Sequence, residues 1–189
     1  MNTGKHSAAP DATEKMNETL SNGSSFTMET WVYQKEEGSY NTIIGKGDHQ
    51  ATIRTMGKDY VTVYIYNGAW IQNDFTMPSD WIGKWHHLAA VVDGTDMRVY
   101  CDSVELACPN KKAITGEIRE SDEPFGVVFE SEHMGSRDGK NKYAYVRIYS
   151  KALSEDEIKQ QMAADLGEGA YAVQENDESV VMWLDYSKA

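Results

Sequence analysis

Residues 60–76 read Tyr-Val-Thr-Val-Tyr-Ile-Tyr-Asn-Gly-Ala-Trp-Ile-Gln-Asn-Asp-Phe-Thr. Side chains alternate between the two faces of a β-strand, so the valines and first isoleucine fall on one face and the tyrosines on the other. A three-residue loop at 67–69 predicts a hairpin in which Ile65 lies opposite Ile71. A two-residue Asn-Gly turn would instead place Trp70 beside Ile65. The first register keeps one face apolar and the other aromatic.

A similar pattern extends along most of the 189 residues. Short runs rich in Val, Ile, Thr, Tyr and Trp alternate with clusters of Gly, Asp and Asn. The pattern predicts an all-β fold, an antiparallel sandwich of two sheets in a single module spanning residues 1–189. The polar segment 1–25 is expected to be largely loop. We expect strands near residues 26–33, 41–45, 50–55, 60–66, 70–77, 84–93, 96–102, 104–108, 125–130 and 142–149, and a closing strand at 179–186.

One short helix is expected over residues 154–166. Ser154 and Glu157 have the spacing of a capping box, in which each side chain bonds the backbone amide of the other. Leu153 and Ile158 are placed to form a hydrophobic staple across the start of the helix. These local signals favour a structural helix that packs on its own sheet.

The charge balance excludes several classes of partner. Eighteen Lys and Arg against 30 Asp and Glu give a formal net charge of −12, which repels nucleic acid and anionic membranes. No apolar run approaches the roughly 18 residues of a membrane-spanning helix, so we expect no membrane insertion. Cys101 and Cys108 flank a predicted hairpin turn on one face, too far apart to bridge, and are expected to be core residues.

Enzyme chemistry on a glycan would require two carboxylates flanking the scissile bond. The acids at 155–157 are explained by helix capping, and Glu130 and Glu132 lie in an apparent strand-to-loop exit. His86 and His87 are neighbours on a strand and point to opposite faces, so they are expected to be buried structural histidines among apolar residues. We therefore expect no catalytic residues and a binding function.

The aromatic face of the hairpin has the groups that sugars require. Aromatic rings stack on sugar C–H faces, and planar polar groups bond the hydroxyls. We assign Trp70 and Tyr64 as stacking residues and Arg54 and Gln72 as hydrogen-bond donors. Two alternatives stay open: these rings are good strand residues covered by a loop, or Arg54 pairs with Asp74 across the sheet.

Several segments together resemble the laminin-G-like, concanavalin-A-like jelly-roll family. This resemblance implies a two-sheet jelly roll whose concave sheet and rim loops bind glycans, often as a carbohydrate-binding module of a secreted bacterial glycosidase or adhesin. The closing segment Val180-Val-Met-Trp-Leu-Asp-Tyr186 resembles strands at module boundaries of multimodular β-galactosidases. The segments that carry the family resemblance are Phe26-Thr-Met-Glu-Thr-Trp-Val32, Thr42-Ile-Ile-Gly-Lys-Gly-Asp48, Gly83-Lys-Trp-His-His-Leu-Ala-Ala-Val-Val-Asp-Gly94, Met97-Arg-Val-Tyr-Cys-Asp102 and Val146-Arg-Ile-Tyr-Ser-Lys-Ala-Leu-Ser154.

The resemblance also implies polar contacts from two rim loops. These are Asp48 and His49 after a Lys-Gly turn, and Glu132, His133 and Arg137 in the polar loop 130–140. Family members often carry an acidic pair before the Val-Arg-Ile-Tyr motif, but here those positions are Ala144 and Tyr145. Some relatives bind calcium, and this option stays open, because the oxygen donors Asp48, Glu130, Glu132 and Asp138 are scattered and fit surface acids equally well.

The sequence and the resemblance together predict non-catalytic binding of terminal galactose, lactose or N-acetyllactosamine. Such a module would hold an attached glycosidase or adhesin, secreted or on the cell surface, close to its substrate. The alternative is a structural spacer or protein-interaction module whose aromatic face docks against a neighbouring module.

Overall fold

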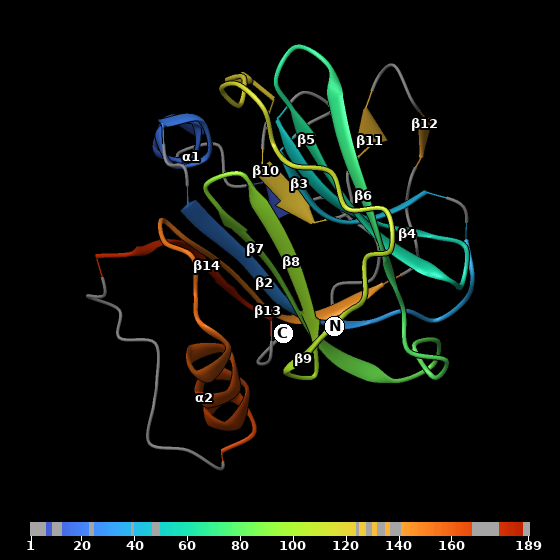
Figure 1. Ribbon diagram of the computed structural model, residues 1–189. Helices are drawn as coiled ribbons and strands as arrows, with labels where there is room; N and C mark the ends of the chain where they lie inside the picture. The colour runs from blue at the N-terminus through green and yellow to red at the C-terminus, as the bar shows by residue number, and fades with distance from the viewer. Residues whose placement is uncertain are drawn as a thin grey trace.

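Two six-stranded antiparallel sheets pack face to face in the computed structural model (Figure 1). This arrangement confirms the expected all-β sandwich. The structure describes residues 7–8, 13–22, 25–38, 40–46, 50–123, 125–127, 130–131, 135–136, 141–167 and 178–186. The first sheet has the order β1 (Ser7–Ala8), β10 (Phe125–Val127), β3 (Asn41–Lys46), β4 (Ala51–Met56), β5 (Tyr60–Tyr66) and β6 (Trp70–Thr76). The second has the order β14 (Val180–Asp185), β13 (Lys142–Tyr149), β2 (Ser25–Tyr33), β7 (Trp85–Asp93), β8 (Asp96–Cys101) and β9 (Val104–Glu105).

A third, two-stranded ladder pairs β11 (Glu130–Ser131) with β12 (Gly135–Ser136). The core lies between the two large sheets and is made by alternate residues of their strands. In β5 the valines and isoleucine are fully or almost fully buried, as the alternation predicts. Cys101 also faces this core opposite Val104, and both Cys101 and Cys108 are free thiols as expected.

The β5–β6 hairpin has the register that the sequence favours. Ile65 lies opposite Ile71 and Tyr66 opposite Trp70, with a three-residue loop between the strands. Asn67 holds this loop, since its side-chain oxygen accepts from the Ala69 amide at 3.0 Å. The central Gly68 has φ of 110°, which L side chains rarely adopt. The loop chemistry therefore selects the register that separates the apolar face from the aromatic face.

The N-terminal segment corrects one expectation. Residues predicted as loop form the short helix α1 (Thr13–Asn17) and a π-helical turn, η2 (Glu18–Asn22). Leu20 is fully buried. The Asn17 side-chain oxygen accepts from Lys46 Nζ at 2.6 Å and from the Ser121 amide at 3.1 Å. These contacts with distant residues hold the segment in place, and no local pattern predicts them.

Helix α2 (Glu155–Asp165) lies on the outer face of the second sheet (Figure 1). The capping box is confirmed, because Ser154 Oγ accepts from the Glu157 amide at 3.2 Å and Glu157 Oε2 accepts from the Ser154 amide at 2.8 Å. Leu153 and Ile158 are buried in a small cluster with outward-facing residues of β7, β8 and β13. The helix therefore covers this face as predicted.

A buried charge network joins α2 to the two strands beneath it. Arg147 of β13 donates to Glu29 of β2 at 2.7 Å and to Asp165 at the end of α2 at 2.9 Å. Tyr149 Oη donates to Glu29 at 3.1 Å, and Trp31 Nε1 donates to Asp165 at 2.8 Å. Glu29 is fully buried and Arg147 is 2% exposed. One guanidinium therefore fixes two strands and a helix relative to one another.

We predict that Glu29→Gln lowers the free energy of unfolding at pH 7 by about 3–5 kcal/mol, because it leaves the Arg147 charge buried without its main partner. Burial alone would raise the pKa of Glu29, but His87 and Arg147 outweigh it and hold this pKa below the ordinary value of 4.5. The ionised form therefore stabilises the fold above pH 4.5, and this stability is lost as the pH falls through the folded-state pKa.

Urea denaturation of wild type and Glu29→Gln, at pH 7 and at several pH values below 4.5, measures the difference. It should be largest at pH 7 and shrink on acidification. Glu105→Gln, which changes an exposed glutamate of β9, is the matched control and should unfold like wild type. Equal stability of Glu29→Gln and wild type at pH 7 would contradict the assigned role.

Candidate functional site

The outward side of β5 and β6 carries a strip of aromatic and polar side chains, here called the aromatic face. Trp70 is 41% exposed at one end. Its ring centroid lies 5.0 Å from that of Tyr66 and 5.9 Å from that of Tyr64. Tyr60 is 42% exposed at the other end. The members of the aromatic face are Tyr60, Thr62, Tyr64, Tyr66, Trp70, Gln72 and Asp74.

Polar groups lie between the two exposed rings. Asp74 Oδ1 accepts from Thr62 Oγ1 at 2.7 Å and from Gln72 Nε2 at 2.9 Å. The strand β5 from Tyr60 to Tyr66 advances by about 20 Å at the usual rise per residue. The aromatic face is therefore a strip with a ring platform at each end and hydrogen-bonding groups in the middle.

Two hollows meet at Tyr60, a residue that the sequence placed on this face without assigning it a role. One has a volume of about 310 Å³ and is lined by Tyr60, Gln72, Asp74, Pro109, Asn110 and Lys112. The other, of about 570 Å³, is lined by Tyr60 together with Glu37, Lys58, Asp59, Thr76, Met77, Ser79, Trp81 and Ile82. The residues after Cys108 belong to an irregular segment, so the strand pattern could not place them here.

Tyr64 and Arg54 lie beneath the exposed rings. Tyr64 is 9% and Arg54 5% exposed. The Arg54 guanidinium stacks over the Tyr64 ring, 5.2 Å from its centroid, and Nε donates to Thr42 Oγ1 at 3.3 Å. The structure thus brings Arg54, Tyr64 and Trp70 together as predicted, but the first two offer little surface and support the third.

The predicted rim residues lie outside the described part of the chain. This applies to Asp48, His49, Glu132, His133 and Arg137, and to Asp138 among the calcium candidates. For Glu130 the structure describes only the backbone, in β11. The rim contacts and the calcium site therefore stay predictions.

The two adjacent histidines point to opposite faces of β7, as the alternation predicts. His86 stacks on Trp81 at 5.0 Å, and His87 contacts Trp31 edge-on at 5.4 Å. Both are buried as expected, but the prediction of apolar surroundings is wrong for both. His86 Nδ1 lies 2.7 Å from an Asp102 carboxylate oxygen, and His87 Nε2 lies 3.6 Å from Glu29 Oε2. Burial lowers and the Asp102 contact raises the pKa of His86, and the net shift is upward.

A second exposed ring group lies on the outer face of the other sheet. Trp85 is 42% exposed, and its ring centroid lies 5.8 Å from that of Tyr33. Lys142 Nζ sits 5.2 Å from the Tyr33 ring centroid. Because Trp85 lies on the other sheet, this group supplies a control position for experiments on the aromatic face. No helix among the described residues is long and apolar enough to cross a membrane.

The sandwich and its outward aromatic face define a lectin-like β-sandwich domain. The model of the Laminin_G_3 family, described as the concanavalin A-like lectin/glucanases superfamily, matches residues 4–159. The chain therefore belongs to this superfamily, as the sequence resemblance implies. No curated protein matches the chain.

Solved structures share the fold at low sequence identity. A Bacteroides ovatus protein named as a putative carbohydrate binding protein superposes with a TM-score of 0.68 at 20% identity, over 88% of this chain and 46% of its own. A Trypanosoma rangeli sialidase superposes with a TM-score of 0.63 at 17% identity, over 89% of this chain and 27% of its own. Botulinum neurotoxin type C, a toxin whose cell entry depends on two ganglioside molecules, superposes with a TM-score of 0.54 at 15% identity, over 77% of this chain and 36% of its own. The chain spans less than half the length of each.

We predict that Tyr64→Ala lowers the free energy of unfolding by about 3–5 kcal/mol, because it removes a buried ring. Trp70→Ala, which truncates a ring that is 41% exposed, should cost much less. Urea denaturation checks the ranking. Tyr64→Phe keeps the ring and loses the hydroxyl, which lies 3.7 Å from Met56 Sδ, so it should lower the free energy of unfolding by much less than Tyr64→Ala. A larger loss of stability for Trp70→Ala than for Tyr64→Ala would contradict the assignment of Trp70 as the exposed ring and Tyr64 as the buried ring that supports it.

Proposed function

We propose that the aromatic face binds a carbohydrate and leaves it chemically unchanged. The observation that carries this proposal is the exposed Trp70 ring, held by Tyr66 and Tyr64 next to Gln72 and Asp74. A sugar needs both an aromatic platform for its C–H face and directional partners for its hydroxyls. Membership of a lectin and glucanase superfamily supports the proposal.

The carboxylates available on this face favour binding over hydrolysis. Glycoside hydrolysis uses two carboxyl groups on either side of the scissile bond. Within β3, β4, β5 and β6, Asp74 is the one carboxylate, and it already accepts hydrogen bonds from Thr62 and Gln72. Glu29 and Asp165 are engaged by Arg147 beneath α2. These groups can orient a ligand or hold the fold, and we assign none of them to catalysis.

The ligand we propose is a glycan ending in galactose, lactose or N-acetyllactosamine. Trp70 would stack on the C–H face of the terminal ring, and Gln72 would bond its hydroxyls. With few contacts beyond those that water already provides, a single site should bind with a Kd of about micromolar to millimolar. Attachment to a larger secreted or cell-surface protein would compensate by multivalency, and the partial coverage of longer related structures supports such a modular setting.

A spacer module is the second candidate. Its support is that Trp70 and Tyr60 are both large, exposed rings on one face, which could instead dock against a neighbouring module of the same protein. In that case the aromatic face would be indifferent to sugars and would be covered in longer chains.

A glycan array that includes terminal galactose, lactose and N-acetyllactosamine tests the proposal. Wild type, Trp70→Ala and Trp85→Ala are applied first with calcium and then with chelator. Trp85 has nearly the same exposure as Trp70 but lies on the other sheet, so it controls for loss of an exposed indole. We expect Trp70→Ala to lose at least about tenfold in affinity, equivalent to about 1.4 kcal/mol, and Trp85→Ala to bind like wild type.

Binding to no glycan in either condition would overturn the proposal in favour of the spacer. Glycan binding that survives Trp70→Ala would keep the function and reject this face. Loss of binding on chelation would support a calcium site.

A further inference from the structure

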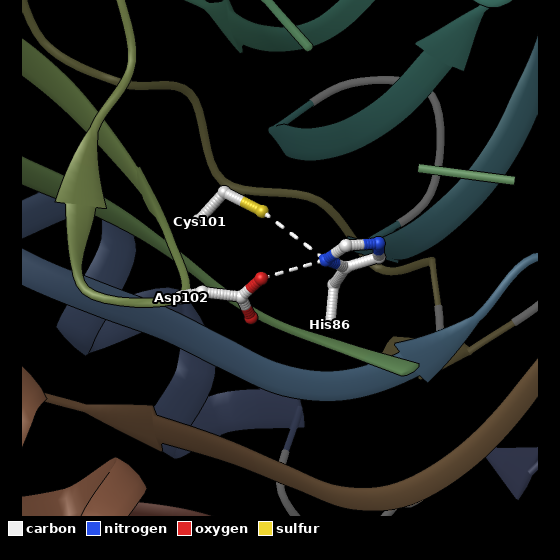
Figure 2. A group of neighbouring side chains, drawn as sticks. All are labelled: His86, Cys101 and Asp102. Atoms are coloured by element: carbon white, nitrogen blue, oxygen red, sulfur yellow. Dashed lines mark hydrogen bonds and ion pairs between the residues drawn. The ribbon is translucent and has the colours of Figure 1, made fainter. Parts of the chain in front are cut away.

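Three side chains of types that can ligate metals converge at the turn between β8 and β9. His86 comes from β7, Cys101 ends β8, and Asp102 begins the turn. Cys101 Sγ lies 3.8 Å and Asp102 Oδ2 lies 2.7 Å from the same atom, His86 Nδ1. Figure 2 shows both side chains directed at this ring nitrogen. The strand ends at Cys101, and Asp102 has φ of 50°, so the usual alternation of neighbouring side chains no longer applies here.

We propose that His86, Cys101 and Asp102 form a binding site for a thiophilic divalent cation of the zinc type. The three ligand atoms lie within 4.8 Å of one another. A tetrahedral zinc ion with its usual bond lengths would hold sulfur and nitrogen about 3.5 Å apart, and oxygen and nitrogen about 3.3 Å apart. The observed sulfur–nitrogen separation of 3.8 Å is about 0.3 Å longer, and the observed oxygen–nitrogen separation of 2.7 Å is about 0.6 Å shorter. Small side-chain rotations would therefore complete the site.

The surroundings of His86 orient its ring for a metal. Nε2 lies 3.2 Å from the backbone oxygen of Asp80. When a cation takes the place of the Nδ1 proton, a neutral imidazole that donates Nε2–H to this oxygen presents the Nδ1 lone pair to the cation between Cys101 and Asp102. Metal-binding histidines commonly use their second nitrogen in this way. Trp81 lies parallel to the ring, with an interplanar angle of 12°, and holds its plane.

Asp102 is held in the same manner. Its Oδ1 accepts from the His87 amide at 2.9 Å, which leaves Oδ2 as the ligand atom. The Asp102 side chain is 42% exposed while that of His86 is 5% exposed. A cation can therefore enter from the Asp102 side, and water can fill a fourth position there. On binding, the thiol proton of Cys101 passes to solvent and a metal–thiolate bond forms. The proton that His86 Nδ1 donates to Asp102 Oδ2 in the metal-free protein leaves that nitrogen for Nε2 or for solvent, which frees Nδ1 for the metal.

The donor set selects the metal class. Thiolate and imidazole suit zinc, whereas calcium prefers six or more oxygen ligands. The structure brings together one other group of possible ligands among its described residues, Glu29, His87 and Asp165. There, Arg147 already pairs with both carboxylates, so a cation would have to displace a buried guanidinium. The His86 group has no such competitor among the described side chains and is independent of the sugar-binding proposal.

Cobalt(II) is the probe, because a cobalt–thiolate bond gives a charge-transfer absorption band and tetrahedral cobalt absorbs strongly in the visible. Untagged protein is reduced, freed of metal with chelator, and titrated with Co²⁺ and then Zn²⁺. We expect one Co²⁺ per chain with the thiolate band, loss of the band when Zn²⁺ displaces Co²⁺, and a higher Tm with Zn²⁺.

Three variants locate the ligands. Cys101→Ser should lose the thiolate band, and Asp102→Asn should weaken metal affinity by more than about tenfold. Cys108→Ser removes the second thiol and is the matched control, which should keep the band. If Cys101→Ser fails to fold, Asp102→Asn and Cys108→Ser still decide the question. Absence of the band in wild type, its loss in Cys108→Ser, or unchanged affinity in Asp102→Asn would overturn the proposal.

Discussion

The ion pair between Arg147 and Glu29 is the constraint on which the second sheet depends. Both groups are removed from water, so neither can lose its partner without leaving an uncompensated charge in the interior. The pair joins β13 to β2, and Asp165 extends it to the end of α2. Because β2 also pairs with β7 along its whole length, the position of one guanidinium sets the outer face of this sheet and the helix that covers it.

The outward faces of the two sheets differ in how far helices cover them. On the second sheet, α2 buries Tyr149 and its neighbours. Among the described residues of this face, the exposed ring is that of Trp85, which lies beside Tyr33 toward one end of the sheet. No described helix covers β5 and β6, and their outward side retains Trp70 and Tyr60 in contact with solvent. The exposed rings of Trp70 and Tyr60 thus lie on the sheet that contributes no residue to the charge network.

Local patterns predicted much of this structure, because local chemistry determines it. The β5–β6 register follows from alternation and from the Asn67–Ala69 loop, and the start of α2 follows from a capping box within four residues. Contacts between distant residues were not predictable. Glu29 and Arg147 are 118 positions apart, and the Asp102 carboxylate reaches His86 only because a hairpin returns the chain to β7. Alternation placed Arg54 and Tyr64 on the correct face but carries no information about their burial.

The burial of Arg54 and Tyr64 favours a rigid platform over an adaptable one. A guanidinium beneath Tyr64 and two rings against Trp70 restrict the rotamers of the exposed indole before any ligand arrives. Side chains ordered in advance reduce the entropy lost on binding, which otherwise costs about 0.5–1.5 kcal/mol for each immobilised group. For a shallow surface with few hydrogen-bonding groups, this saving is a large part of the affinity that a single sugar can gain. In the proposed sugar site, Arg54 and Tyr64 would contribute to binding through the order they impose on Trp70, which would touch the ligand.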